Sequence, residues 1–345
     1  GLMRLHKAGK VSNAHKGAHE GYSVTTFAMG TAELYEWLDG QDHTWPVPPP
    51  VQPVEATPFA EPIDGIAAVT WSVYGTVLRI SDGCLYLDHP QQFRMQVAME
   101  KTIKAFNMWQ SMSRKSGAPW EYLYDQYSDC LAIKQMAGTG RTGDLIHVSA
   151  TDLWEVLIER LVQNEYEIDE AFYGDAEQFA QKVAFFFHQA LQGVEAAADA
   201  AAVLTAIAGS GCRQTLLADA QPFTLVQLLR ALSRDATLPP LGELLDADAM
   251  TLSCQVGLRK PSPSLYRGCL DRLAENGIEP SEVLHVGSRL RNDLAVAKRL
   301  GMKTALYAGD SSSFEASKDD IRDPELRPDR LLTELTQVPT VLGID

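Results

Sequence analysis

Short apolar runs that end in turn residues flank a long central region of the chain. The first, Ile66–Leu78, is rich in β-branched side chains and stops at Tyr74-Gly75-Thr76. Four later apolar runs lie at residues 214–218, 250–252, 283–287 and 304–307, and segments with a helical apolar period lie between the runs. Strands that alternate with helices predict an α/β fold with a Rossmann-like parallel sheet, covered on both faces.

The central region, from Pro90 to Gly209, has a different period. Its apolar residues recur three or four positions apart, for example at Leu153, Leu157 and Leu161. This spacing places them on one face of a helix. Because no part of the region has the pattern of a strand ladder, we expect a large all-helical domain inserted after the first core strand.

Residues 1–63 precede the first strand and have their own composition. A basic start and a short helical pattern at Thr31–Leu38 lead into seven prolines between Pro46 and Pro62. Proline lacks the amide donor of a helix or central strand, which predicts an extended linker or a surface arm. The predicted domains are an N-terminal arm with a Pro-rich linker (1–63), a core (64–88 and 210–345) and a helical domain (89–209).

The composition is that of an ordinary globular protein of about two domains. Of the 345 residues, 45% are hydrophobic and 22% are charged. A formal net charge of -15 argues against nucleic acid or an anionic membrane as a partner. No apolar run approaches the ~18 residues of a membrane span. The N-terminus has no secretory pattern and the five cysteines form no Cys-x-x-Cys pair, so we expect a cytoplasmic protein with reduced thiols.

The end of the first apolar run resembles the first motif of the haloacid dehalogenase-like hydrolase superfamily. That motif is an apolar strand followed by Asp-x-Asp-Gly-Thr or Asp-x-Tyr-Gly-Thr. This chain has the Gly-Thr at Gly75 and Thr76, with Tyr74 before them, but Ser72 stands at the position of the nucleophilic Asp. In that family the helical insert is called a cap, so the resemblance implies a core with a cap and a cleft between them.

Later segments resemble the other motifs of the family in the same order. Residues 217–219 fall at the second motif, where Ala218 replaces a Ser or Thr, and residues 256–261 resemble the third, with its lysine at Lys260. Residues 286–293 resemble the fourth motif, usually Gly-Asp-(three residues)-Asn-Asp. There Ser288 replaces the first carboxylate, while Asn292 and Asp293 are kept.

The resemblance implies a set of site residues. The catalytic positions are Ser72, Tyr74 and Lys260. The substrate-binding positions are Gly75, Thr76, Ala218, Asp219 and Asn292. Asp293 is the remaining candidate metal ligand, and Mg²⁺ usually takes one or two carboxylates with water and substrate. With two family carboxylates replaced, we expect no tightly bound cofactor, Mg²⁺ included.

Alternatives stay open for several of these residues. Ser72 could act as a nucleophile if a base lay within hydrogen-bond reach, but no Gly-x-Ser-x-Gly elbow surrounds it and the direction of His285 is not fixed by strand alternation. Asp219 is also typical of a helix cap or loop, and Lys260 of a surface lysine before proline.

Two further patterns match known sites but lack the context of those sites. His15 and His19 have the spacing of a helical metal pair, although a solvated tail explains them better. Residues 138–143 match Gly-x-Gly-x-x-Gly without a preceding strand, which favours a loop between helices over a phosphate-binding turn.

The preferred hypothesis is a catalytically degenerate member of the family that binds a small phosphate- or carboxylate-bearing molecule in the cleft. The alternative is an active hydrolase with a rearranged site. For that alternative, a phosphatase is favoured over a 2-haloacid dehalogenase. The expected partner is therefore a small anionic molecule, and the sequence does not exclude a protein partner.

Overall fold

The apolar runs form a six-stranded sheet in the computed structural model, which describes residues 24–136 and 143–344. Its neighbouring strands run parallel. From one edge to the other they are β10 (Arg330–Leu332), β9 (Lys303–Tyr307), β8 (Val283–Gly287), β1 (Ala68–Trp71), β5 (Arg213–Ala218) and β6 (Thr251–Leu252). Five of the six lie on predicted runs. The exception is β10, which the apolar pattern did not predict.

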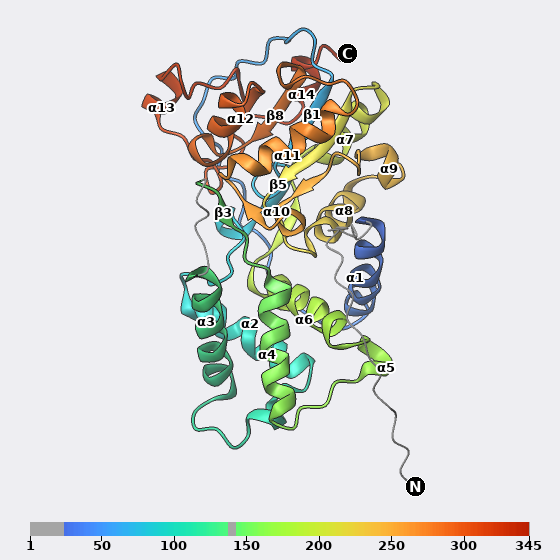
Figure 1. Cartoon of the computed structure of the whole chain (residues 1–345), viewed down its shortest axis with the longest axis vertical. Helices are drawn as coiled ribbons and strands as arrows, with labels where there is room; N and C mark the ends of the chain where they lie inside the picture. The colour runs from blue at the N-terminus through green and yellow to red at the C-terminus, as the bar shows by residue number, and fades with distance from the viewer. Residues whose placement is uncertain (1–23, 137–142, 345) are drawn as a thin grey trace, which may run out of the picture.

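Helices cover both faces of this sheet, which confirms the predicted α/β class (Figure 1). One face packs on α7 (Ala200–Gly209), α8 (Thr224–Asp235) and α14 (Gln337–Val341). The other face packs on α11 (Pro263–Ala274) and α12 (Ala295–Arg299). Strand alternation explains the division, since Val69 and Trp71 belong to the first apolar cluster and Ala68 to the second.

Shorter elements complete this part of the chain. They are α9 (Leu241–Leu244), α10 (Ser253–Val256), β7 (Leu258–Arg259), α13 (Lys318–Arg322), three-residue 3₁₀ turns at Ser81–Gly83 and Pro280–Glu282, and a π-helical turn at Leu290–Leu294.

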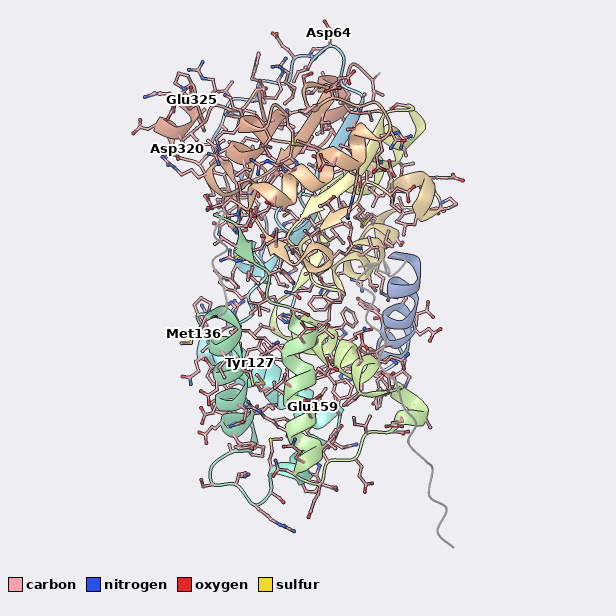
Figure 2. The ribbon with its side chains drawn as sticks, in the orientation of Figure 1. Asp64, Tyr127, Met136, Glu159, Asp320 and Glu325 are labelled. Carbon is pink, nitrogen blue, oxygen red and sulfur yellow. The ribbon has the colours of Figure 1, made fainter. Side chains whose placement is uncertain are left out.

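The central region folds into what we call the helical unit, residues 92–191. It consists of α2 (Gln92–Ala105), a 3₁₀ turn (Met108–Met112), α3 (Pro119–Met136), α4 (Ala150–Gln163), α5 (Glu170–Tyr173) and α6 (Ala176–Leu191). Aromatic and aliphatic side chains fill its interior, and α6 packs against both α2 and α4. Figure 2 shows Tyr127 among these helices, where it is fully buried, and Glu159 on the exposed side of α4.

Three short strands link the helical unit to the sheet. The chain leaves the sheet through β2 (Leu78–Ile80) and returns through β4 (Val194–Ala196), and these two strands pair antiparallel. A third strand, β3 (Leu145–Ile146), pairs with β7. Two short strands therefore lie inside the region predicted to be all helical, because each pairs with a strand from outside it. Helix α7 lies within the predicted helical domain but packs on the sheet; the domain bounds themselves stay a prediction.

The N-terminal part of the described chain begins with α1 (Val24–Asp39), longer than the predicted helical piece. It lies beside α6 and α8 (Figure 1). From there the Pro-rich segment runs extended to the edge of the sheet, where Phe59 forms an antiparallel bridge with Leu331. Within the described ranges, no helix is both long enough and apolar enough to cross a membrane.

Candidate functional site

Ser72 and Asp293 meet at the carboxyl ends of two adjacent strands. Ser72 follows β1 directly, and its amide donates to the carbonyl of Val286 on β8, 3.0 Å away. Asp293 lies in the π-helical turn just after β8. The Ser72 hydroxyl donates to Asp293 Oδ2 at 2.5 Å. The position expected to hold a nucleophile is therefore bonded to the carboxylate expected to hold a metal.

Lys260, which follows β7, joins the same pair. Its Nζ lies 2.6 Å from Ser72 Oγ and 2.7 Å from Asp293 Oδ1. Only 8% of the Lys260 side chain is exposed, so it is not the surface lysine that the alternative described. The geometry brings together three of the residues that the motifs singled out, from three separate segments.

Two further side chains bind Asp293, and the motifs did not include either. His285 Nε2 and the Tyr266 hydroxyl each lie 2.7 Å from Asp293 Oδ1. Tyr266 comes from α11, which packs under this face of the sheet. The sequence carries only a weak signal for either residue. His285 lies in an apolar strand pattern that does not show which face its side chain occupies, and Tyr266 is one of many aromatic residues in helical patterns.

The hydrogen bonds also assign the protonation of His285. An ionised carboxylate can only accept, so Nε2 carries a hydrogen and donates to Asp293. Nδ1 then accepts from the Thr70 hydroxyl at 2.8 Å, on the neighbouring strand. Burial lowers the pKa of His285, although nearby Asp293 opposes this, and the imidazole is neutral at pH 7.

Asp293 is buried yet ionised. Burial alone would raise its pKa, but the hydrogen bonds from His285 and Lys260 and the positive charge of Lys260 hold the pKa far below its usual range. Because His285 is neutral, Lys260 is the cation that balances the carboxylate. Asp293 is consequently a very weak base.

The donors around Asp293 leave little room for a metal ion. Oδ1 accepts from Lys260, His285 and Tyr266, and Oδ2 accepts from Ser72. Mg²⁺ needs oxygen lone pairs that are free to coordinate it. In addition, no group of three or more His, Cys, Asp or Glu residues suited to a metal occurs among the described residues. The residues present do not fit a resident Mg²⁺ ion.

Asp219 lies beside this network, not within it. Its Oδ1 accepts from the backbone amide of Lys260 at 2.8 Å. The cavity above admits water to Asp219, but protein atoms surround the carboxylate, and this poor solvation raises its pKa. Ala218, one residue earlier, is buried at the end of β5 and offers the site no side-chain hydrogen bond.

Tyr74 connects the site to the helical unit. Its hydroxyl donates to Gln227 Oε1 at 2.7 Å and contacts Thr224 Oγ1 at 2.8 Å. Gln227 in turn donates to Gln189 of α6 at 3.3 Å. Burial raises the pKa of Tyr74, which keeps the phenol neutral. Tyr74 is therefore held as a hydrogen-bond donor between the sheet and the helices.

Gly75 and Thr76 shape the turn below the site and do not line its cavity. Gly75 has a positive φ of 84°, and a Cβ there would lie 2.6 Å from Ser313 Cβ, so only glycine fits. Thr76 is fully buried, and its hydroxyl has no hydrogen-bond partner among the described residues. Both residues line a smaller neighbouring pocket instead.

The fourth-motif residues separate in space. The π-helical turn directs Asp293 inward, whereas the side chain of Asn292, an exposed residue, donates to Glu315 at 2.7 Å. Ser288 is nearly buried and lines the cavity with Asn292. A ligand-binding role for Asn292 stays a prediction.

A cavity of about 780 Å³ opens above Ser72, between the sheet and the helical unit. Lys134 and β3 line one side, and the loop after β2, which includes Tyr86, lines another. Its charged lining residues are four cations (Lys134, Arg259, Lys260 and Arg289) and three acids (Asp88, Asp219 and Asp293). In a chain of net charge -15, this is a locally positive pocket.

Two patterns noted in the sequence lie outside the described residues. The His15 and His19 pair falls in the N-terminal 23 residues, and all but the last glycine of the 138–143 pattern falls in the internal gap.

Comparisons with known proteins agree with the motifs. Residues 257–338 match a family model described as "HAD-hyrolase-like". A glyceraldehyde 3-phosphate phosphatase from Methanopyrus kandleri is 35% identical over 86 residues, which is 24% of this chain and 36% of that protein. The chain thus spans only about a third of this curated relative. The resemblance to the haloacid dehalogenase-like hydrolases is confirmed, and the family model matches the part of the chain that contains β8, β9 and β10.

Solved structures of the same group also resemble the chain. The match to a 2-haloacid dehalogenase from Pseudomonas syringae pv. Tomato covers 81% of this chain and 98% of the dehalogenase chain, with 20% identity and a TM-score of 0.46. A HAD phosphatase from Thermococcus onnurineus has the same coverage, with 16% identity and a TM-score of 0.44. Both TM-scores are low.

Proposed function

We infer that this chain, related to the haloacid dehalogenase-like hydrolases, is a catalytically degenerate member that binds a small phosphate- or carboxylate-bearing molecule. The binding site is the cavity between the sheet and the helical unit. Binding needs no metal ion, and the bound molecule is not turned over by the phosphatase chemistry of the family.

The state of Asp293 is the observation that supports this proposal most. Phosphoryl transfer to a carboxylate requires a nucleophilic Asp, and Ser72 stands at that position. Asp293 cannot replace it, because its oxygens accept from Ser72, Lys260 and other donors. The carboxylate that remains serves to hold the strand ends together.

Serine catalysis lacks a base of adequate strength. A general base works best when its pKa lies near the working pH. Asp293 is within reach of Ser72, but its pKa is held far below the usual range. Both ring nitrogens of His285 are engaged, by Asp293 and by Thr70, and neither bonds Ser72. Deprotonation of Ser72 by either group is therefore unfavourable.

The cavity supplies the attraction for an anion. Lys260 is balanced by Asp293, so the attraction comes mainly from Arg259, Arg289 and Lys134. Backbone amides after Ser72 can add hydrogen bonds, as successive amides do in anion-binding turns.

An active phosphatase is the second candidate, because the curated relative is named as one. Such an enzyme would need a nucleophile other than a first-motif Asp. A 2-haloacid dehalogenase is less favoured, since that chemistry also requires the missing carboxylate.

Calorimetric titration with inorganic phosphate tests the binding. We expect binding in the presence of a chelator, with no tightening by Mg²⁺. Arg289→Ala should weaken it about tenfold through the loss of a charge-assisted hydrogen bond. Arg267→Ala, an exposed arginine of α11 outside the cavity, is the matched control. Absence of binding by the parent, or equal weakening by both variants, would contradict the proposal.

An assay with aryl phosphates and Mg²⁺ tests the absence of turnover. We expect no appreciable release of phosphate. Turnover that disappears in Ser72→Ala would establish serine chemistry, and turnover that survives would place the reaction at another site.

A further inference from the structure

The helical unit is joined to the sheet by two adjacent chain crossings, β2 and β4. In these strands Leu78 faces Ala196, Arg79 faces Glu195 and Ile80 faces Val194. The cavity has walls from both sides of these crossings. Any change in the angle between the two units must therefore bend the chain at this pair of strands, and would open or close the cavity.

A second segment crosses the same junction. We call residues 43–62 the strap. On the helical side, the Lys101 ammonium donates to the carbonyl of Thr44 at 2.7 Å. The ring of Trp45 packs edge-on against Phe186, with 5.2 Å between centroids. The start of the strap is thus fixed to α2 and α6.

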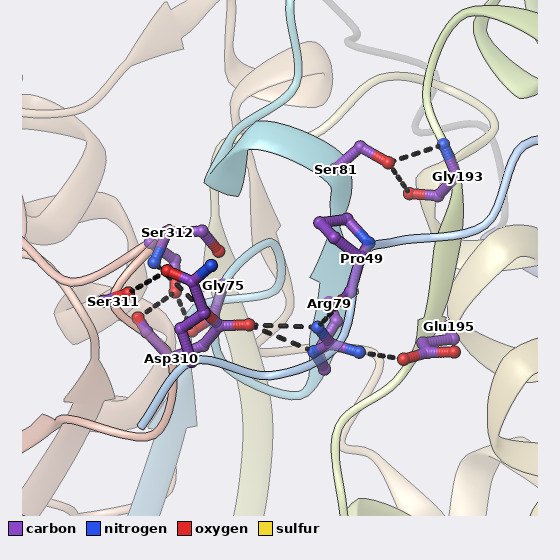
Figure 3. Close-up of polar contacts among 11 residues, drawn as sticks. Pro49, Gly75, Arg79, Ser81, Gly193, Glu195, Asp310, Ser311 and Ser312 are labelled. Atoms are coloured by element: carbon purple, nitrogen blue, oxygen red, sulfur yellow. Dashed lines mark hydrogen bonds and ion pairs between the residues drawn. The ribbon is translucent and has the colours of Figure 1, made fainter. Parts of the chain in front are cut away.

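At the crossing itself, the strap backbone lies directly on Gly193, the residue before β4. A Cβ at Gly193 would lie 2.5 Å from the carbonyl carbon of Val47 and 2.6 Å from the carbonyl oxygen of Pro46. Gly193 also binds Ser81, at the end of β2, through its amide and its carbonyl (Figure 3). Glycine is required here by the approach of the strap, because any side chain would displace it.

Arg79 of β2 ties the strap to the crossing and to the sheet. Its guanidinium donates to the carbonyl of Pro49 at 2.6 Å and to Asp310, in the loop after β9, at 3.1 and 3.2 Å (Figure 3). It also pairs with Glu195 of β4. Only 12% of the Arg79 side chain is exposed, so these bonds are partly protected from water and salt.

The far end of the strap is bonded to the edge of the sheet. Gln52 accepts from the amide of Ser311 at 2.8 Å. Phe59 and Leu331 exchange two backbone hydrogen bonds, at 2.7 and 3.1 Å. Arg330 donates to the carbonyls of Glu61 and Pro62. The strap is therefore attached on both sides of the crossing and at the crossing.

The composition of the strap suits this task. Its seven prolines restrict the backbone before it docks, which reduces the entropy lost on ordering. Proline keeps its carbonyl, and Pro49 and Pro62 both accept from arginines through that group.

We propose that the strap is a brace that fixes the angle between the helical unit and the sheet and so controls ligand exchange at the cavity. This inference rests on the proposed anion binding for its functional consequence. Release of the strap at Gly193 and Arg79 would free β2 and β4 to bend, and a bound anion would then leave faster.

Hydrogen exchange of the whole chain, followed by mass spectrometry, tests the brace without reference to any ligand. Gly193→Ala should displace the strap and make the amides of β2 and β4 exchange about tenfold faster, as local opening becomes easier. Gly268→Ala is the matched control, since nothing lies within 4 Å of a Cβ at that helical glycine. It should leave β2 and β4 unchanged.

Arg79→Met provides a second route if the alanine variant does not fold. It should also accelerate exchange in β4, because the links of Arg79 to Glu195 of β4, to Pro49 and to Asp310 are lost. Parent-like exchange in β2 and β4, with the strap amides already exposed, would overturn the brace.

Phosphate release, measured from phosphorus NMR line widths, tests the functional consequence. We expect faster release in Gly193→Ala than in Gly268→Ala. Equal release in the two variants, with faster exchange at β2 and β4 in the first, would overturn the control of ligand exchange. Failure of the parent to bind phosphate would instead contradict the proposed function, and the exchange comparison would still decide whether the strap braces the junction.

Discussion

The helical unit and the sheet bury different kinds of side chain. Inside the helical unit, aromatic rings pack on one another, as Phe106 does on Phe179 and Phe186 at 5.5 and 5.2 Å between centroids. The sheet is packed mainly with aliphatic side chains and has a buried cluster of polar and charged groups at its strand ends.

The buried ionisable groups of the two regions differ in the same way. His188 of α6 is 1% exposed, and neither ring nitrogen has a hydrogen-bond partner among the described residues. Asp293 is equally buried but has a donor on each oxygen and a cation beside it. Apolar packing therefore holds the helical unit together, whereas the strand ends depend on a charged network that must stay complete.

Removal of the cation from this network should have the largest effect. Lys260→Met leaves Asp293 buried without a balancing charge, which should cost about 3–5 kcal/mol of unfolding free energy. Urea denaturation measures it. Lys104→Met, an exposed lysine of the helical unit, is the control and should change stability by less than about 0.5 kcal/mol.

The double variant Lys260→Met with Asp293→Asn sharpens the test. It removes both charges but keeps an oxygen that can accept from Ser72, and it should recover part of the loss. A single variant as stable as the parent would mean that the network does not hold the strand ends.

The resemblance to the family motifs predicted that Ser72, Lys260 and Asp293 gather at one site. It could not predict the bonds among them. The family pattern separates a nucleophile from a metal ligand, whereas the loss of one carboxylate lets Ser72 and Asp293 bond directly.

Other parts of the site could not be predicted, because the apolar periods of strands and helices do not show where an individual side chain points. His285 sits in a strand buried on both faces, so its neighbours in the sequence do not reveal which face it occupies. Tyr266 depends on the packing of α11 beneath the sheet. The strap was predicted as extended, but its path across Gly193 is a tertiary contact without a local pattern.

Lowering the pH should affect the stability of the two regions over different pH ranges. Burial lowers the pKa of His188 to about 3. An unfolded chain binds a proton at this histidine below about pH 6.5, whereas the folded chain does not until near pH 3. Stability therefore falls as pH drops through this window, by about 1.4 kcal/mol per pH unit from this residue alone.

His188→Leu should remove this part of the pH dependence. Urea denaturation at pH 7 and pH 5 then shows a smaller difference for the variant than for the parent. His147 and His285, whose pKa values are also lowered, are present in both proteins and cancel in the comparison. Asp293 has a depressed pKa, so its contribution is complete above about pH 4 and is lost only at lower pH. Equal pH dependence in parent and variant would contradict the assignment to His188.

We propose that the strand-end site binds no metal ion because two of the family's carboxylates are replaced by Ser72 and Ser288. Thermal unfolding with and without Mg²⁺ tests it, on the parent and on the double variant Ser72→Asp with Ser288→Asp. Both serines line the cavity next to Asp293, so two added carboxylates should rebuild a metal pocket around it. At tenfold excess over its Kd, Mg²⁺ should raise the Tm of the double variant by about 2 °C, because it binds only the native state. The parent should show no shift. An equal Mg²⁺ response in both proteins would mean that the replaced carboxylates are not what prevents metal binding.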